Sequence, residues 1–244
     1  MAEIKIGCGP FLPSRQKYME QFGCVEVSDA WFDPIPPKTL AKWQAKTPKG
    51  FDYLHVAWGW LGRDPLDAKE APPFKFPKND FGLMQPTDAN RTVWQHVDAQ
   101  ARALGATTVL LKTPPTFAPS ENNRANMATF VREIIGEVPY GIAWEPRGFW
   151  EVEETAALAK ELDIVVVRDV YGEFEMPEPP TEGDAYYALT APWGRTFFSK
   201  EDLFDLYDFL DAHPAKVWTV FRGNDRERNA TALAAVIAEE RGES

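Results

Sequence analysis

Eight short apolar runs, rich in β-branched residues, alternate with amphipathic segments along this chain of 244 residues. Such alternation is typical of parallel α/β folds, in which each strand is followed by a helix. Eight alternations in a chain of this length predict an α/β fold, a single (β/α)8 TIM-type barrel over residues 1–244, with an open doubly wound sheet as the alternative. The predicted strands are Glu3–Gly9, Cys24–Asp29, Phe51–Trp58, Thr107–Thr113, Tyr140–Glu145, Asp163–Asp169, Ala185–Thr190 and Lys216–Arg222. The predicted helices are Ser14–Phe22, Pro37–Lys46, Ala89–Leu104, Asn122–Ile135, Glu151–Leu162, Lys200–Ala212 and Arg226–Glu240.

Two connections depart from this regular spacing. Gly59–Pro86, after strand 3, is long, rich in proline and aromatic residues, and lacks a helical period. Tyr171–Gly183, after strand 6, contains Met176-Pro-Glu-Pro-Pro180 and stands where the sixth helix would be, as an irregular, acidic segment. Long connections in compact domains are usually binding loops or lids. We therefore expect Gly59–Pro86 to be an ordered lid over the carboxyl ends of the strands, anchored by Trp58 and Trp60.

The charge of the chain limits its partners. Acidic residues outnumber basic ones, 37 to 26, and the formal net charge is −11. Nucleic acids and anionic membranes are bound by positive surfaces, so this acidic protein is expected to bind neither. The first residues contain no apolar signal region and no apolar run is long enough to span a bilayer, so a cytoplasmic location is expected. Cys8 and Cys24 are expected to be buried reduced thiols.

Polar and charged side chains gather where the predicted strands end, and ligands of parallel α/β folds bind at the carboxyl ends of the strands. In Gly141–Trp150 a short apolar run ends in Glu145 and Arg147, and a proline and a glycine then prevent regular structure. If Val25 and Val27 meet the helices, strand alternation turns Glu26 into the barrel, where a carboxylate needs a cation. Arg147, Lys112 and Arg222 are the candidates for that cation. The predicted substrate-binding residues are Glu26, His55, Lys112, Arg147, Arg222 and Asn224, and the predicted catalytic residues are Glu145 and Asp169.

These residue types suit acid–base chemistry on a small polar molecule. Glu145 is the expected general acid or base with Asp169 as its partner, and the cationic side chains hold an anionic group. Carboxylates held among cations can have their pKa values pushed apart, as acid–base catalysis requires. The same network can instead be structural and brace the loops of a non-catalytic barrel. Whether the protein is an enzyme therefore stays open, and the sequence identifies no cofactor.

Other chemistries have weaker support. A Mg²⁺ or Mn²⁺ site built from Glu26, Glu145 and Asp169 is disfavoured by the cations beside them, and no Cys/His zinc spacing occurs, so no metal is expected. No serine stands in a nucleophile elbow, and no dinucleotide or phosphate-binding glycine motif follows the first strand. Five tryptophans that follow predicted strands either wall a pocket or, as we favour, pack in the core: Trp31, Trp58, Trp60, Trp150 and Trp193.

Several motifs occur along the chain in the order of a known family. The most specific are Val109-Leu-Leu-Lys-Thr-Pro-Pro-Thr-Phe117 and Trp144-Glu-Pro-Arg-Gly148. Further matches are Ile4–Gly7, Val25–Asp29, Phe51–Tyr53, Arg168-Asp169, Phe221–Asn224 and Asn229-Ala230. Together they resemble the DUF72 family, also called YecE-like proteins, over nearly the whole chain. The resemblance implies a TIM barrel but no reaction, because the family is one of unknown biochemical function.

The chain differs from the family pattern in four places, and so resembles a divergent member of that family. A lysine of the family pattern is Val56 here, a histidine is Gly148, and the glutamine before the two prolines is Lys112. The family's Arg-Leu-His-Gly reads Ala188-Leu-Thr-Ala191. Fewer proton-transfer groups remain as a result.

The resulting prediction is a barrel that binds a small polar molecule, anionic or sugar-like, at the carboxyl ends of its strands. Glu and Asp would provide acid–base groups, and Arg and Lys would hold the anion. A non-catalytic ligand-binding or structural barrel is the alternative, and nucleic-acid processing is the least favoured. The sequence does not indicate an oligomeric state.

Overall fold

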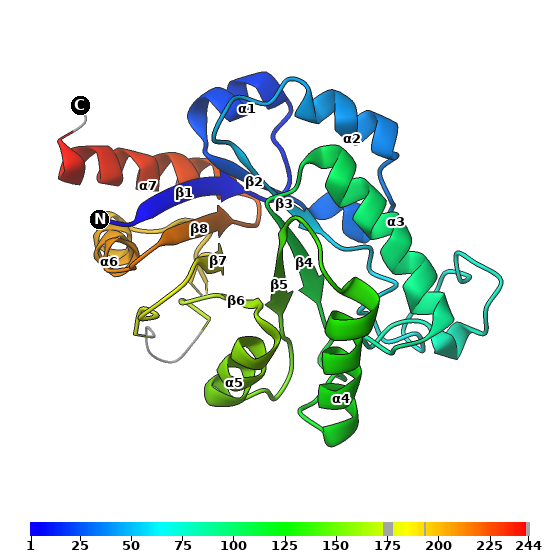
Figure 1. Cartoon of the computed structure of the whole chain (residues 1–244). Coiled ribbons are helices and arrows are strands. Elements are labelled where there is room, and N and C mark those ends of the chain that lie inside the picture. Colours follow the sequence, from blue (N-terminus) through cyan, green and yellow to red (C-terminus); the bar gives the residue numbers. More distant parts are fainter. Residues whose placement is uncertain (173–177, 193, 243–244) are drawn as a thin grey trace. The chain divides into compact units, whose positions relative to one another are not determined.

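The computed structural model describes residues 1–172, 178–192 and 194–242, and its strands and helices alternate as the sequence predicts (Figure 1). The strands are β1 (Glu3–Cys8), β2 (Cys24–Val27), β3 (Asp52–Val56), β4 (Thr108–Lys112), β5 (Gly141–Glu145), β6 (Val165–Arg168), β7 (Ala185–Leu189) and β8 (Lys216–Phe221). The α-helices are α1 (Arg15–Gln21), α2 (Pro37–Gln44), α3 (Asp88–Leu104), α4 (Glu121–Thr129), α5 (Val152–Leu162), α6 (Lys200–Asp211) and α7 (Arg226–Arg241). Three short helices are η1 (Ser28–Trp31), η2 (Lys78–Asp80) and the π-helix η3 (Phe130–Ile135).

The eight strands form a closed parallel barrel in chain order. The first strand pairs with the second through Gly7 and Cys24. It also pairs along its whole length with the last strand, from Glu3 opposite Lys216 to Cys8 opposite Phe221. The predicted TIM-type barrel is thereby confirmed, and the open doubly wound sheet, in which first and last strands do not meet, is excluded.

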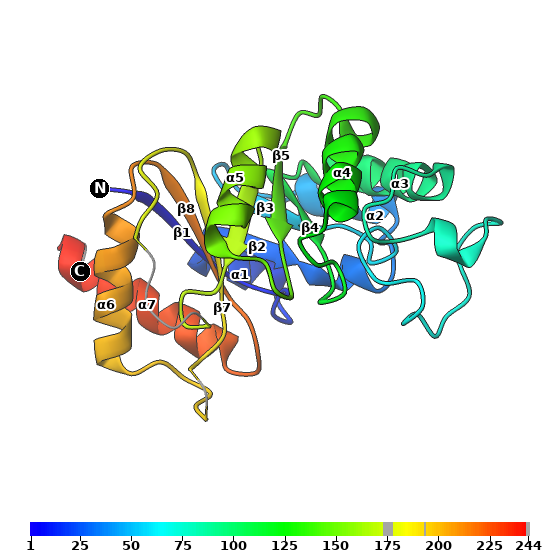
Figure 2. The ribbon, with the colours of Figure 1, turned by 90° about the horizontal axis from the view of Figure 1, so that it is seen from below.

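Contacts along the chain divide it into two compact units, which we describe separately. The first unit comprises residues Met1–Val27, Pro48–Asp52 and Val167–Ser244, and the second comprises Ser28–Thr47 and Tyr53–Val166. In the first unit α7 packs on β1 and β8, and α6 lies beside α7 (Figure 2). The expectation of one domain over the whole chain stays a prediction. Within the described residues, no helix combines the length and the apolar character that a membrane span needs.

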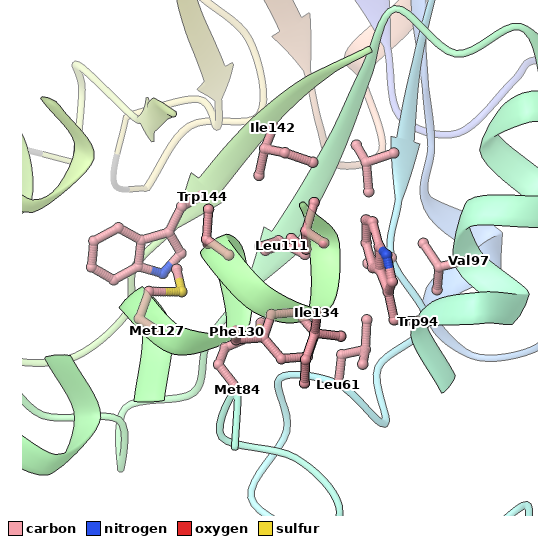
Figure 3. Packing of buried hydrophobic residues seen from close by; sticks show 14 of the residues in the cluster. Leu61, Met84, Trp94, Val97, Leu111, Met127, Phe130, Ile134, Ile142 and Trp144 are labelled. Atoms are coloured by element: carbon pink, nitrogen blue, oxygen red, sulfur yellow. The ribbon is translucent and has the colours of Figure 1, made fainter. Parts of the chain in front are cut away.

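The core of the second unit lies between β3–β5 and the helices that follow them. Side chains of β4 and β5, such as Leu111 and Trp144, meet Trp94 of α3 and Phe130 of η3 (Figure 3). All four are buried, and each large apolar side chain removed from water contributes about 1.5–3 kcal/mol to stability. The helix α3 is capped at its amino end by Thr87, whose hydroxyl accepts the N–H of Asn90, and at its carboxyl end by Gly105 in the left-handed conformation.

One predicted helix, Asn122–Ile135, differs from the structure. It is divided into α4 and the π-helix η3, and the N–H of Gly136 closes the wider turn by donating to the carbonyl of Val131 at 3.0 Å. The wider turn places Phe130, Ile134 and Ile135 in the core. The helical period in the sequence does not distinguish these two kinds of helix.

The long connection after β3, residues 59–86, is ordered by buried contacts. Phe81 and Met84 are fully buried in the second unit. The side chain of Asn90 in α3 accepts the N–H of Gly82 and donates to the carbonyls of Gly82 and Gln85, each at 2.9 Å. These bonds hold Met84 at a φ of 49°, a backbone conformation that a residue other than glycine rarely adopts. An ordered loop agrees with the sequence, whereas its action as a lid stays a prediction.

The connection after β6 contains no helix in its described part, residues 169–172 and 178–184. This agrees with the predicted irregular segment in place of the sixth helix. Residues 173–177, which include Met176, lie outside the described residues, as does Trp193.

Candidate functional site

Glu26, the third residue of β2, is the most enclosed carboxylate of the candidate site, with 1% of the residue exposed. Arg222, which directly follows β8, donates from Nε to Oε1 at 3.1 Å and from Nη2 to Oε2 at 2.5 Å. Tyr186 of β7 donates its hydroxyl to Oε2 at 2.6 Å. Burying a carboxylate is costly unless it is paired and hydrogen-bonded, and these contacts meet both conditions. Of the three cations proposed for Glu26, the structure pairs it with Arg222.

Local geometry in the first unit leaves room for this buried pair. Gly9 follows β1, and a Cβ at this position would lie only 3.0 Å from Oε1 of Glu26. A larger residue at Gly9 would therefore push the carboxylate away from Arg222. Burial and the charge of Glu26 raise the pKa of Tyr186 well above its usual range, so its hydroxyl remains a donor.

Asp169 is the first residue after β6 and is half-buried. Its Oδ2 accepts the N–H of Thr190 at 3.1 Å and its Oδ1 accepts the N–H of Tyr171 at 3.2 Å. Burial raises the pKa of the Asp169 carboxyl, and these N–H groups and the charge of Arg222 offset part of the rise. Arg222 thus acts on both Glu26 and Asp169 within the first unit. A carboxyl with a raised pKa retains its proton at a higher pH, which suits a general acid.

The second unit contains a more open group of charges at the ends of β4 and β5. Lys112 is the last residue of β4, and its Nζ lies 3.3 Å from Oε2 of Glu145, the last residue of β5. Arg147 approaches the other carboxylate oxygen, with Nη2 3.6 Å from Oε1. The side chain of Arg147 remains 60% exposed, whereas that of Glu145 is 11% exposed. Glu145 therefore lies between two cations, one of which largely faces solvent.

The glycine that follows Arg147 fixes the path of the backbone in this loop. Gly148 has a φ of 96°, and a Cβ there would lie 2.6 Å from the carbonyl oxygen of Pro115. Only glycine fits this close approach without strain, so the family's histidine has no room in this loop as it is built here. Gly148 of the Glu-Pro-Arg-Gly segment is thus packed against Pro115 after β4.

His55 lies on the helix-facing side of β3. It shares a face of β3 with Tyr53, whose hydroxyl lies 2.8 Å from the Thr47 hydroxyl beyond α2, so this face points toward the helices. His55 is fully buried, and burial lowers its pKa to about 4, while Gln100 of α3 acts in the opposite direction. Neither ring nitrogen makes a well-formed hydrogen bond to the described residues. This buried position gives no direct support to a substrate-binding role for His55, which stays a prediction from the sequence.

The remaining predicted positions have simpler settings. Asn224 is exposed in the turn between β8 and α7. Trp58 and Trp60 belong to the buried core of the second unit, and Trp150 packs against it, as the packing interpretation expected. Cys8 and Cys24 are buried free thiols, and burial raises the pKa of Cys8 to about 12. In the part of the chain that the structure describes, no three His, Cys, Asp or Glu side chains are placed to hold a metal ion.

Sequence reasoning missed Tyr186. Strand alternation offered a signal, because Tyr186 and Ala188 share one face of β7 while Tyr187 contacts His213 beyond α6 on the other. A tyrosine turned into the barrel beside a carboxylate is a natural hydrogen-bond donor. Tyr186 is uncharged and is the second residue of its strand, so it is not among the polar and charged groups that gather where the strands end.

Comparisons with known proteins agree with this fold. The profile of the family described as "Protein of unknown function DUF72" matches residues 12–243. A crystal structure of a DUF72 family protein from Enterococcus faecalis V583, at 2.52 Å resolution, superposes with a TM-score of 0.70 and 14% sequence identity, covering 97% of this chain and 98% of that chain. A second, at 3.10 Å, gives a TM-score of 0.67 and 12% identity over 97% and 94%. No curated protein matches the sequence. Because the family profile spans nearly all of its length, this chain belongs to the DUF72 family.

Proposed function

We propose that this DUF72 barrel binds a small polar molecule, anionic or sugar-like, at the carboxyl ends of its strands. The group of Lys112, Glu145 and Arg147 carries this proposal. Arg147 contacts Glu145 yet keeps 60% of its side chain exposed, so its planar fork of N–H donors can also bind a ligand. These three residues bear two positive charges and one negative charge, in a protein whose net charge is −11. A local excess of positive charge on an acidic protein favours an anion.

The same positions suit proton transfer. Glu145 lies between two cations, and the raised pKa of Asp169 fits a proton donor. These two carboxylates belong to different compact units, so their joint action on one molecule stays a prediction from the sequence. A non-catalytic binding protein would use the same cations without turnover. Action in the cytoplasm is likewise an expectation from the sequence alone.

Thermal-shift measurements and calorimetric titration with inorganic phosphate, malonate and ribose 5-phosphate test the proposal. At least one probe is expected to raise the melting temperature, because a ligand of the folded state stabilises it by mass action. Arg147→Gln should weaken that probe about 10–100-fold, the loss expected for a charge-assisted hydrogen bond. The melting temperature without ligand should change little, since Arg147 is mostly exposed.

Arg132→Gln is the matched control. Arg132 is 56% exposed and pairs with Glu161 at 2.6 Å on the helical surface of the same unit. Its replacement should leave probe binding unchanged. Equal binding by the wild type and Arg147→Gln would refute the assigned anion contact. Turnover of a bound compound that disappears in Asp169→Asn would distinguish an enzyme from a non-catalytic binder.

A further inference from the structure

The loop from β5 to α5 carries an exposed aromatic residue, Phe149, two positions after Arg147. The backbone of the loop is held on both sides of Phe149. On the amino-terminal side, Gly148 packs directly against the carbonyl of Pro115, with no room for a Cβ. On the carboxyl-terminal side, the side chains of Glu151 and Glu154 form a capping box that begins α5. The backbone of Phe149 is therefore constrained at both ends.

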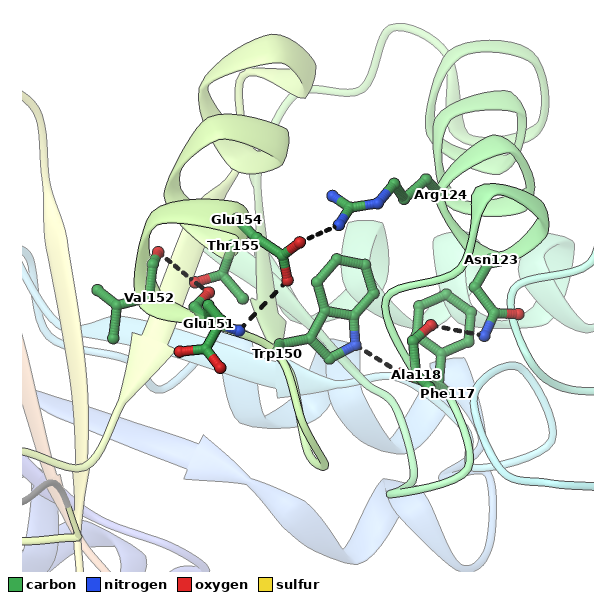
Figure 4. A network of polar contacts seen from close by, with 9 residues as sticks. All are labelled: Phe117, Ala118, Asn123, Arg124, Trp150, Glu151, Val152, Glu154 and Thr155. Atoms are coloured by element: carbon green, nitrogen blue, oxygen red, sulfur yellow. Dashed lines mark hydrogen bonds and ion pairs between the residues drawn. The ribbon is translucent and has the colours of Figure 1, made fainter.

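Trp150 provides the main anchor of this loop (Figure 4). Its indole N–H donates to the carbonyl of Phe117 at 2.5 Å, and its ring stacks on that of Phe117 with centroids 6.0 Å apart. The guanidinium of Arg124 lies over the Trp150 ring, 5.0 Å from its centroid. Its Nη2 is also 2.6 Å from Oε1 of Glu154. Because these contacts hold the partly buried Trp150 in place, the loop cannot turn Phe149 inward without breaking them.

Phe149 itself is 86% exposed, and Val152, at the start of α5, is 46% exposed. A single exposed apolar side chain is ordinary on a protein surface. Here, however, an aromatic ring projects from an anchored loop two residues from an exposed guanidinium. Residues two apart are separated by at most about 7 Å between Cα atoms, a spacing that a small molecule can bridge.

We propose that Phe149 is a stacking platform that makes this site select anions carrying a planar aromatic or heteroaromatic ring, such as a nucleoside monophosphate. Arg147 binds the anionic group, and the ring of the ligand lies on the ring of Phe149. Since Arg147 holds the anion, this inference rests on the proposed function. Because the backbone on both sides of Phe149 is held before binding, little backbone freedom is lost when a ligand stacks on its ring.

Isothermal titration of the full chain with AMP, phenyl phosphate and ribose 5-phosphate tests the platform. The two ring-bearing phosphates should bind about tenfold more tightly than ribose 5-phosphate, an effect typical of one base stacked on one aromatic side chain. Phe149→Ala should remove that advantage and leave the affinity for ribose 5-phosphate unchanged. Phe149→Trp should retain it, whereas Phe149→Leu, matched in apolar character but without an aromatic face, should lose most of it.

The outcomes separate the platform from the anion site. If all three phosphates bind equally and Arg147→Gln weakens all three, the anion site stands and the stacking role of Phe149 is overturned. An advantage for AMP that survives in Phe149→Ala also overturns it. If none of the three phosphates binds the wild type, both the platform and the proposed anion site fall. Because Phe149 is exposed, its variants should unfold at the wild-type temperature, so lost binding reports on the contact.

Discussion

Glu26 and Glu145 each stand beside an arginine near the end of a barrel strand, but the two groups differ in their access to solvent. Arg222 binds Glu26 through two nitrogens and has a side chain only 20% exposed. Arg147 approaches Glu145 through one nitrogen at 3.6 Å and has a side chain 60% exposed. The first group has its hydrogen bonds made within the protein, and the second retains donors that face water.

The difference indicates how the same pair of residue types can serve two purposes. A buried pair with good geometry holds its strands in one arrangement. Removing either partner destabilises the fold, because the remaining buried charge is left uncompensated. An exposed guanidinium adds little stability, because solvent already satisfies it. It can exchange that solvent for a ligand at low cost. We therefore interpret the Glu26 group as structural support, and the Glu145 group as the one whose exposed arginine fits the proposed ligand contact.

The largest expected effect comes from removing the charge of Glu26. Glu26→Gln removes the carboxylate that Arg222, with a side chain only 20% exposed, binds through two nitrogens, and it should lower the free energy of unfolding by about 3–5 kcal/mol. Urea denaturation followed by tryptophan fluorescence would measure the loss. In the exposed pair Arg132–Glu161, Glu161→Gln should cost at most about 0.5 kcal/mol. Equal losses in the two variants would show that the Glu26 pair is not a buried support.

A smaller loss of stability is expected when the pH is lowered, because His55 is buried and neutral in the folded protein. Its pKa is about 4 in the folded protein and about 6.5 when unfolded, so only the unfolded chain takes up a proton between these values. Stability linked to His55 is thus fully present above pH 6.5 and lost as the pH falls toward 4. At pH 5 the loss should reach about 2 kcal/mol.

Unfolding curves at pH 7 and pH 5 for the wild type and His55→Leu would test this. The variant should lose less stability over that interval than the wild type, whatever its stability at pH 7. His96→Gln is the control, because His96 is exposed on α3 and stacks on Phe74 with ring centroids 5.1 Å apart. The same pH dependence in the wild type and His55→Leu would contradict the assignment.

Much of the fold followed from periodicity. The strand and helix patterns predicted the barrel, and alternation on β2 placed Glu26 inward with a need for a cation. His55 shows what strand position alone does not give, since lying near a strand end says nothing of the face that a side chain occupies. The same alternation, applied to Tyr53 and His55, would have assigned both side chains to the helix-facing side.

Other features depend on long-range geometry that no local pattern contains. Arg222, Arg147 and Lys112 were equal candidates to pair with Glu26 in the sequence. The choice of Arg222 follows from the pairing of β1 with both β2 and β8, which brings together residues 196 positions apart. The π-helix η3 and the packing of Gly148 on Pro115 likewise depend on neighbouring elements.

Of the two carboxylates compared, Glu145 is expected to show the smaller change in stability, and Glu145→Gln is the sharpest test of the difference between the two groups. Lys112 and Arg147 would lose a counter-charge, but Arg147 is already hydrated and the flexible lysine side chain can bring its ammonium to water. We expect a loss of about 1 kcal/mol in unfolding free energy, well below that of Glu26→Gln. Affinity for ribose 5-phosphate should rise several-fold, because a carboxylate that repels the anion is gone. Denaturation and titration of the same preparation measure both quantities. A loss as large as that of Glu26→Gln, with no gain in affinity, would make the second group a structural pair like the first.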